Sequence, residues 1–197
     1  MKYKSGKERN WTVLCIGGAS GTGKSTLAYE LARFYNINVL EADDICQALK
    51  ASTAKEIFPA MHYWSTGVNW KDIGVEGNVK WLIDVSKEMI AGIKAIVARH
   101  IEDALPVIIE GDFVCPELTL SFNDPKIKFM YVHESDKNQL LQNFLKREGG
   151  DLQHYRADIS IAYGNRLRET CKNLGIHFIE ARPWNTLLDR AVSCLKK

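Results

Sequence analysis

The chain has 197 residues, the length of one domain or of one domain with an inserted subregion. Its apolar fraction of 46% and charged fraction of 25% are those of an ordinary globular protein with a sizeable core. The 26 Lys and Arg nearly balance the 24 Asp and Glu, so charge alone gives no sign of binding to nucleic acid or to a membrane. No apolar run approaches the roughly 20 residues of a membrane span.

The N-terminus and the cysteines favour a cytoplasmic protein. Residues 1–10 are polar and lack the apolar centre of a signal peptide, so we expect a loose leader there. The cysteines are odd in number, scattered and without metal-type spacing: Cys15, Cys46, Cys115, Cys171 and Cys194. Most lie beside apolar residues, which predicts buried thiols in a reducing compartment.

A glycine-rich loop follows the first predicted strand, residues 11–16, and precedes a predicted amphipathic helix, residues 26–35. Its sequence fits the phosphate-binding pattern G-x-x-x-x-G-K-[ST]. The residues expected to contact a nucleotide are Gly18, Ala19, Ser20, Gly21, Thr22, Gly23, Lys24, Ser25 and Thr26. A loop between strand and helix directs backbone N–H groups and the helix dipole at phosphate oxygens. The alternative is a glycine-rich turn without a ligand.

Within this loop, Lys24 is expected to reach the β- and γ-phosphates of ATP, and the Ser25 hydroxyl to ligate Mg²⁺. Two acids, Asp43 and Asp44, follow the second predicted strand, residues 38–41. A carboxylate there can accept a proton from an acceptor hydroxyl, and Asp43 is the preferred candidate for this catalytic role. The alternative is a helix N-cap, which Asp also favours.

Residues 51–81 interrupt the alternation of strands and helices with an aromatic-rich stretch that has no clean period. It lies where ligands bind in open α/β sheets, so we predict an acceptor-binding excursion with His62, Trp64 and Trp70 contacting the substrate. The alternative is a small satellite core under a long loop. A long apolar stripe at helical spacing follows, over residues 79–97.

The third predicted strand, residues 106–110, ends in acids, as a Walker B strand does. Glu110 and Asp112 are candidates to hold the metal, with ordinary solvated acids as the alternative. After the fourth strand, residues 126–133, and a short helical stripe, Arg147 and Arg156 flank a glycine pair. We predict a flap over residues 146–157 whose arginines neutralise the phosphoryl group in transfer.

The last predicted strand, residues 176–180, follows a helix over residues 159–174 that Gly175 is expected to end. The loop after this strand contains Arg182 and Trp184, which are candidates to contact the nucleotide, with the Trp184 side chain offering the base a flat face. The alternative is a turn at the start of the last helix, capped by Asn185 or Thr186. The five strands, each separated by helices, favour an α/β fold with helices on both faces of a parallel sheet.

Three segments carry a resemblance to a known family. Residues 17–26 with 28–32, residues 42–45, and residues 109–111 resemble the opening, the second-strand Asp motif and the third-strand motif of 2-phosphoglycerate kinase and its short relatives. Chloramphenicol phosphotransferases and zeta-type kinases have a similar Asp after their second strand, where it acts as the base. The resemblance implies the three-layer P-loop kinase fold, strand order 2-3-1-4-5, and a base at Asp43. Asp112 departs from the phosphoglycerate pattern, where an apolar residue is expected.

We therefore expect an ATP- and Mg²⁺-dependent kinase that phosphorylates a small-molecule acceptor, such as a phosphoglycerate, a sugar or another hydroxyl compound. A nucleoside or nucleotide kinase and a regulatory P-loop ATPase with a protein partner are the alternatives. A nucleic-acid 5′-end kinase is disfavoured by the balanced charge. We expect a monomer or homodimer in the cytoplasm, with no membrane partner.

Overall fold

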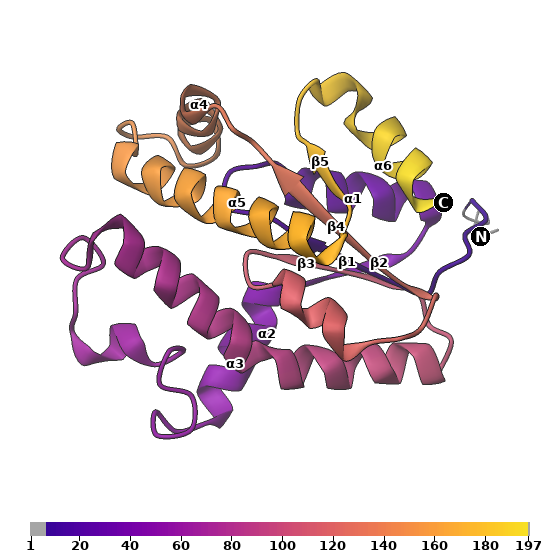
Figure 1. Ribbon diagram of the computed structural model, residues 1–197, viewed down its shortest axis with the longest axis horizontal. Helices are drawn as coiled ribbons and strands as arrows, with labels where there is room; N and C mark the ends of the chain where they lie inside the picture. The colour runs from indigo at the N-terminus through magenta and orange to yellow at the C-terminus, as the bar shows by residue number, and fades with distance from the viewer. Residues whose placement is uncertain (1–6, 197) are drawn as a thin grey trace.

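The computed structural model describes residues 7–196, and its centre is a five-stranded sheet in the order β2-β3-β1-β4-β5 (Figure 1). All four strand pairs are parallel. The strands are β1 (Val13–Gly17), β2 (Asn38–Glu41), β3 (Val107–Gly111), β4 (Ile127–His133) and β5 (Phe178–Glu180). The expected strand order and parallel sheet are confirmed.

Helices cover both faces of the sheet (Figure 1). The α-helices are α1 (Lys24–Tyr35), α2 (Ala42–Ser52), α3 (Gly74–Glu102), α4 (Lys137–Glu148), α5 (His154–Leu174) and α6 (Leu187–Leu195). Three short 3₁₀ helices are η1 (Tyr63–Thr66), η2 (Pro116–Ser121) and η3 (Trp184–Thr186). One core joins α1 and α6 to the sheet, and the other joins α2 and α3 to its opposite face.

The alternation within β1 explains why one strand serves both cores. Its side chains point to opposite faces in turn. Leu14 and Ile16 pack with α1 and α6, whereas Val13 and Cys15 pack with α2 and α3. All four are fully buried, as the apolar run of a central parallel strand predicts.

Several boundaries differ from those expected. β1 starts at Val13 and not at Trp11, which packs into the core just before the strand. Helix α2 starts at Ala42 with Glu41 as its N-cap, so Asp43 and Asp44 lie in the first turn and neither caps the helix. The described part of the expected leader begins at Lys7, and its first six residues lie outside the described range.

Two helix ends bear on the expectations for the C-terminal third. Gly175 caps α5 in the left-handed conformation, as expected. Thr186 occupies the N-cap of α6, but its side chain makes no capping bond and instead donates to the Pro183 carbonyl, at 3.1 Å. Within residues 7–196, no helix has both the length and the apolar character needed to cross a bilayer.

Candidate active site

The phosphate loop connects the end of β1 to the start of α1, so its backbone lies at a helix N-terminus, where anions bind favourably. Gly23 has a φ of 86°, a conformation that favours glycine, and a Cβ added there would overlap the ring of Trp184. Within the loop, the buried Thr22 hydroxyl donates to the Ala19 carbonyl at 2.9 Å. These contacts therefore define the conformation of the loop.

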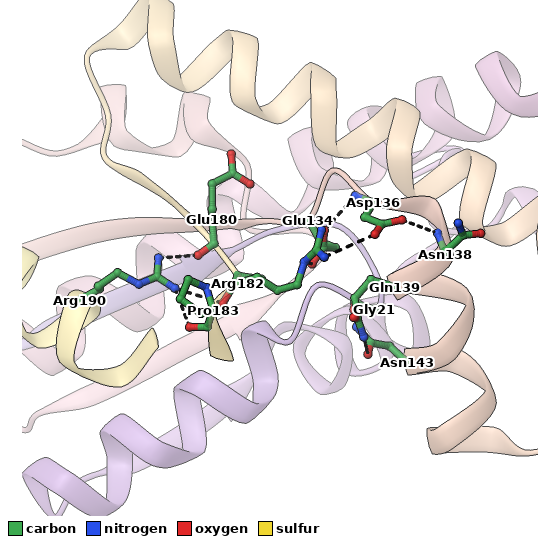
Figure 2. Close-up of polar contacts among 11 residues, drawn as sticks. Gly21, Glu134, Asp136, Asn138, Gln139, Asn143, Glu180, Arg182, Pro183 and Arg190 are labelled. Carbon is green, nitrogen blue, oxygen red and sulfur yellow. Dashed lines mark hydrogen bonds and ion pairs between the residues drawn. The ribbon is translucent and has the colours of Figure 1, made fainter. Parts of the chain in front are cut away.

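Helix α4 anchors the loop from one side. The Asn143 side-chain amide donates to the Gly21 carbonyl at 2.8 Å, and Gln139 donates to Asn143 at 2.9 Å (Figure 2). The buried ring of Phe144 lies so close to Gly21 that an added Cβ would be 2.6 Å from its Cε1 atom. The position of the loop thus depends on the middle of α4.

A buried charge cluster lies beside the loop, because β3 pairs with β1 and places Glu110 opposite Ile16. The Lys24 ammonium forms an ion pair with Asp112, and the Ser25 hydroxyl donates to Glu110 Oε2 at 3.2 Å. Lys24 and Glu110 are only 8% and 4% exposed. The sheet thus brings together residues that are about 85 positions apart in the chain.

The charges in this cluster perturb one another. Burial alone lowers the pKa of Lys24, but the nearby Asp112 and Glu110 outweigh it, so the pKa is raised and the ammonium stays charged. Burial raises the pKa of Glu110, and Lys24 and the Ser25 hydrogen bond oppose this rise. Oxygen ligands of this kind suit Mg²⁺, which proteins usually bind through one or two carboxylates and the substrate phosphates.

Asp43 lies near this cluster, in the first turn of α2, and both Asp43 and the next residue, Asp44, are exposed to solvent. The pKa of Asp43 is raised, because the surrounding protein partly removes its carboxyl from water and because the negative charge of Asp112 is nearby. The positive charge of Lys24 opposes this rise. Among residues 7–196, the Asp43 carboxyl has no hydrogen bond or ion pair. It is therefore an accessible carboxylate within the electrostatic reach of the phosphate loop.

Arg156, on the first turns of α5, is the arginine that reaches the phosphate loop. Its guanidinium donates to Ser20 Oγ at 3.2 Å, to Glu148 Oε1 at 2.8 Å and to Gln153 Oε1 at 3.1 Å. It also lies 4.6 Å from the centre of the Phe144 ring. The contact with Ser20 places a positive charge next to the expected phosphate site.

Arg147 lies at the end of α4 and turns to Glu148, to which its Nη2 donates at 2.6 Å. Hydrogen bonds from Gln153 and from the two arginines hold the pKa of Glu148 at about 2. The segment predicted as a flap consists of the end of α4, a turn containing Gly149 and Gly150, and the start of α5. Both glycines have a positive φ and open space around them.

A cavity of about 740 Å³ opens beside these groups. Its wall includes Ser20 of the phosphate loop, Asp112 after β3 and Arg156 of α5. The remaining lining residues are Trp64, Gly67, Val68, Asn69, Trp70, Asn78, Trp81, Leu82, Gln153, Ile159, Ser160 and Tyr163. The aromatic excursion and two helices thus form one chamber that reaches the phosphate loop.

The predicted substrate residues divide between this wall and its surroundings. Trp64 and Trp70 line the cavity, whereas His62, Asp43 and Asp44 are not among its lining residues. His62 is half-buried and precedes η1, where its carbonyl accepts the Ser65 N–H at 2.9 Å. This position suits a structural role in the turn.

Most of the lining residues are not among the site residues predicted from the sequence, and Asn78, Trp81 and Tyr163 are three of them. Asn78 and Trp81 lie near the start of α3, and Tyr163 lies on the apolar stripe of α5, where sequence reasoning assigns a core position. Asn78 is a polar residue directly before the apolar stripe of residues 79–97, and in the structure it is only 4% exposed. Its amide donates to the carbonyls of Trp70 and Gly74, both at 2.7 Å.

The loop after β5 lies on the other side of the phosphate loop. Arg182 forms two hydrogen bonds to the buried Glu134, at 2.8 and 2.9 Å, and an ion pair with Asp136 at 3.4 Å (Figure 2). Arg190 donates to the Glu180 carbonyl at 2.7 Å (Figure 2). These contacts fix the loop, and Trp184 extends from it to Gly23, with 36% of its surface exposed.

No single part of the described chain forms a complete metal cage. Among residues 7–196, no group of three or more His, Cys, Asp or Glu is arranged to hold a metal ion. The Ser25 hydroxyl with the Glu110 and Asp112 carboxylates nevertheless fits a Mg²⁺ ion whose other ligands are phosphates and water. The donor set therefore agrees with the expected cofactor.

Sequence comparison finds relatives among the 2-phosphoglycerate kinases. The chain is 33% identical to that of Methanopyrus kandleri over 111 residues, covering 54% of this chain and 34% of the relative. It is 32% identical to that of Thermococcus kodakarensis over 196 residues, covering 93% of this chain and 64% of the relative. The chain thus spans less than two thirds of either relative. No protein-family model matches it.

The solved structures that are similar agree on the fold. A gluconokinase from Sinorhizobium meliloti aligns with a TM-score of 0.54 and 15% identity, over 96% of this chain and 94% of that one. Shikimate kinase from Acinetobacter baumannii, in complex with shikimate, aligns with a TM-score of 0.55 and 16% identity, over 95% and 93%. The chain therefore has the fold of the P-loop small-molecule kinases, and its sequence is similar to those of 2-phosphoglycerate kinases.

Proposed function

We propose that this chain transfers the γ-phosphoryl group of ATP to a hydroxyl group of a small molecule held in the 740 Å³ cavity. The observation that carries the proposal is the continuity of the cavity with the phosphate loop through Ser20, Asp112 and Arg156. Donor and acceptor would then meet in one chamber, which is the arrangement that phosphoryl transfer requires. The kinase names of the relatives support the same activity.

In this proposal the loop backbone and Lys24 hold the triphosphate, and Trp184 packs against the base. Ser25, Glu110 and Asp112 would hold Mg²⁺, which when bound neutralises phosphate charge. Lys24 must leave its ion pair with Asp112 to reach the phosphates, and this frees the Asp112 carboxylate. Phosphoryl transfer needs positioning and charge neutralisation more than covalent help, and these residues supply both.

We propose Asp43 as the general base that accepts the proton of the acceptor hydroxyl. Its raised pKa makes it a better proton acceptor than an ordinary aspartate, and its carboxyl is unpaired within the described chain. Asp112 lines the cavity, but its proposed role in holding Mg²⁺ weakens it as a base. Arg156, already beside Ser20, would stabilise the charge on the transferring group, and Arg147 would join it if the turn at Gly149 moves.

The proposal extends to the setting of the protein. All five cysteines lie within residues 7–196 and are free, which suits the reducing cytoplasm that we propose for it. A monomer or homodimer is compatible with the site, because the residues discussed above all come from one chain. The regulatory ATPase remains the second candidate, and it would leave the cavity without a substrate.

The test is ³¹P NMR of the purified chain with Mg-ATP and pools of small alcohols. A kinase should form ADP together with a new phosphoester, and only with certain pools. Asp43→Asn should lower turnover far more than it weakens ATP binding, whereas the matched control Asp44→Asn should change little. ADP and free phosphate at one rate in every pool would exclude the kinase and favour the ATPase.

A further inference from the structure

Within residues 7–196, four aromatic side chains line the acceptor cavity: Trp64, Trp70, Trp81 and Tyr163. The indoles of Trp64 and Trp81 pack at a centroid distance of 4.9 Å, and Trp70 packs with Tyr155 at 5.0 Å. Trp70 remains 38% exposed, so its ring has surface free to meet a ligand. Large, rigid rings give apolar contact area at a low cost in conformational entropy. This wall suits the flat face of a ring.

Hydrogen bonds to the protein hold this wall in place. Asn78 holds the Trp70 carbonyl, and the Trp81 indole N–H donates to the Ala60 carbonyl at 3.0 Å. Tyr163 donates from its hydroxyl to the Asp112 carbonyl at 2.8 Å. Because these donors are bound to the protein, the rings need little rearrangement to form a binding surface.

Charge in the cavity is sparse. Among the described lining residues, the charged side chains are Arg156 and Asp112. The guanidinium of Arg156 is already shared by Glu148, Gln153 and Ser20. A phosphorylated three-carbon acid carries about three negative charges at neutral pH. Binding such an anion here would remove it from water and place it beside a carboxylate, Asp112, with only Arg156, which is already hydrogen-bonded, to balance its charge. Its binding is therefore unfavourable.

Resting on the proposed kinase function, we infer that the acceptor is an uncharged alcohol that carries a ring. The ring stacks on Trp64 and Trp70, and a hydroxyl group points to the phosphate loop beside Ser20 and Asp112. The cavity volume of about 740 Å³ falls within the roughly 300–1,000 Å³ of small-molecule sites and exceeds the need of a three-carbon acid.

The reaction balances without a further reactant. The hydroxyl oxygen of the acceptor forms a bond to the γ-phosphorus, and the bond from that phosphorus to the bridging oxygen of ADP breaks. ADP leaves with the electron pair of that bond. The hydroxyl proton passes to the Asp43 carboxylate and then to solvent.

The experiment compares acceptor pools that differ in charge and shape, with Mg-ATP and ³¹P NMR. Neutral ring alcohols form three arms: nucleosides, pyranose sugars and aryl alcohols. The opposing pool holds 2-phosphoglycerate, 3-phosphoglycerate and glycerate. We expect a new phosphoester in a neutral arm, and that arm names the ring. Transfer to the anionic pool alone would overturn this inference and leave the kinase standing, whereas pool-independent hydrolysis would overturn both.

A variant tests the stacking itself. Trp70→Leu should raise the acceptor KM about tenfold and leave the KM for ATP unchanged, because the ring lines the acceptor cavity and packs on Tyr155 rather than on the phosphate loop. Phe178→Leu is the matched control, since it removes a half-buried ring of β5 that lies 5.4 Å from the Arg168 guanidinium and outside the cavity. An acceptor KM that is the same in Trp70→Leu and in the unsubstituted chain would refute the stacking.

Discussion

Replacing Lys24 by methionine separates the two roles that this side chain has in the site. Methionine keeps much of the length and volume of the lysine stem and removes its charge. In the structure the ammonium pairs with Asp112 beside the buried Glu110, so the variant leaves two carboxylates without their cation. The pKa of Glu110 then rises further, because the charge of Lys24 opposes that rise.

The magnitude follows from the burial of the pair. The Lys24 side chain is 9% exposed and that of Asp112 is 23% exposed. Removal of one partner from a buried pair costs about 3–5 kcal/mol, and we take the lower end, about 3 kcal/mol, because Asp112 keeps access to water. Loss of a positioned charge that stabilises the transition state should also lower kcat by about 10²–10³-fold.

Urea unfolding and acceptor-dependent ADP release measure these two effects separately. The double variant Lys24→Met/Asp112→Asn should recover most of the lost stability, because no carboxylate is left unpaired at position 112, but none of the activity. The control Lys137→Met breaks the exposed pair of Lys137 with Asp158 and should cost at most about 1 kcal/mol. Full activity in Lys24→Met, or no recovery of stability in the double variant, would refute this reasoning.

Three further predictions concern the charges and glycines around the loop. The acidic limb of the pH–rate profile should report the raised pKa of Asp43. Asp112→Asn removes a neighbouring negative charge, so it should lower this pKa and move the limb to lower pH. An unmoved limb would argue against Asp43 as the base. Gly23→Ala should lower the free energy of unfolding by about 1–2 kcal/mol, because Gly23 has a positive φ. It should also weaken Mg-ATP binding, because the added Cβ displaces Trp184. Unchanged binding in a fluorescence titration would contradict the contact of Trp184 with the base. Arg156→Ala should lower kcat at least tenfold with little change in thermal stability, and equal loss of both would indicate a purely structural role.

Much of the fold could be predicted from the sequence, because its elements alternate in type and each strand is a short apolar run. The central strand β1 shows why: its run of four buried side chains is followed at once by the phosphate loop. The strand order came from the family resemblance, since apolar runs alone do not say which strands pair. The start of α2 at Ala42 was missed because two adjacent acids suggested a cap one or two residues later.

The candidate site was harder to predict, because its contacts join residues far apart in the chain. The pairing of Lys24 with Asp112 requires β3 to lie beside β1. Glu148 carries no motif, yet it holds both arginines of the expected flap. Tyr163 lies on an apolar helical stripe typical of a core residue, and only the packing of α5 against α3 brings it to the cavity wall.

The ring of Phe144 joins the two halves of the site. One side of it lies against Gly21 of the phosphate loop, and the Arg156 guanidinium of the acceptor cavity lies 4.6 Å from its centre. A nucleotide that shifts Gly21 would therefore move the ring on which the Arg156 guanidinium packs. An acceptor that binds Arg156 would in turn act on the phosphate loop through the same ring. Binding linkage is reciprocal, so whatever factor ATP applies to acceptor affinity, the acceptor applies to ATP affinity. Substitution of one buried ring would then alter the cooperativity between two ligands that it does not itself recognise.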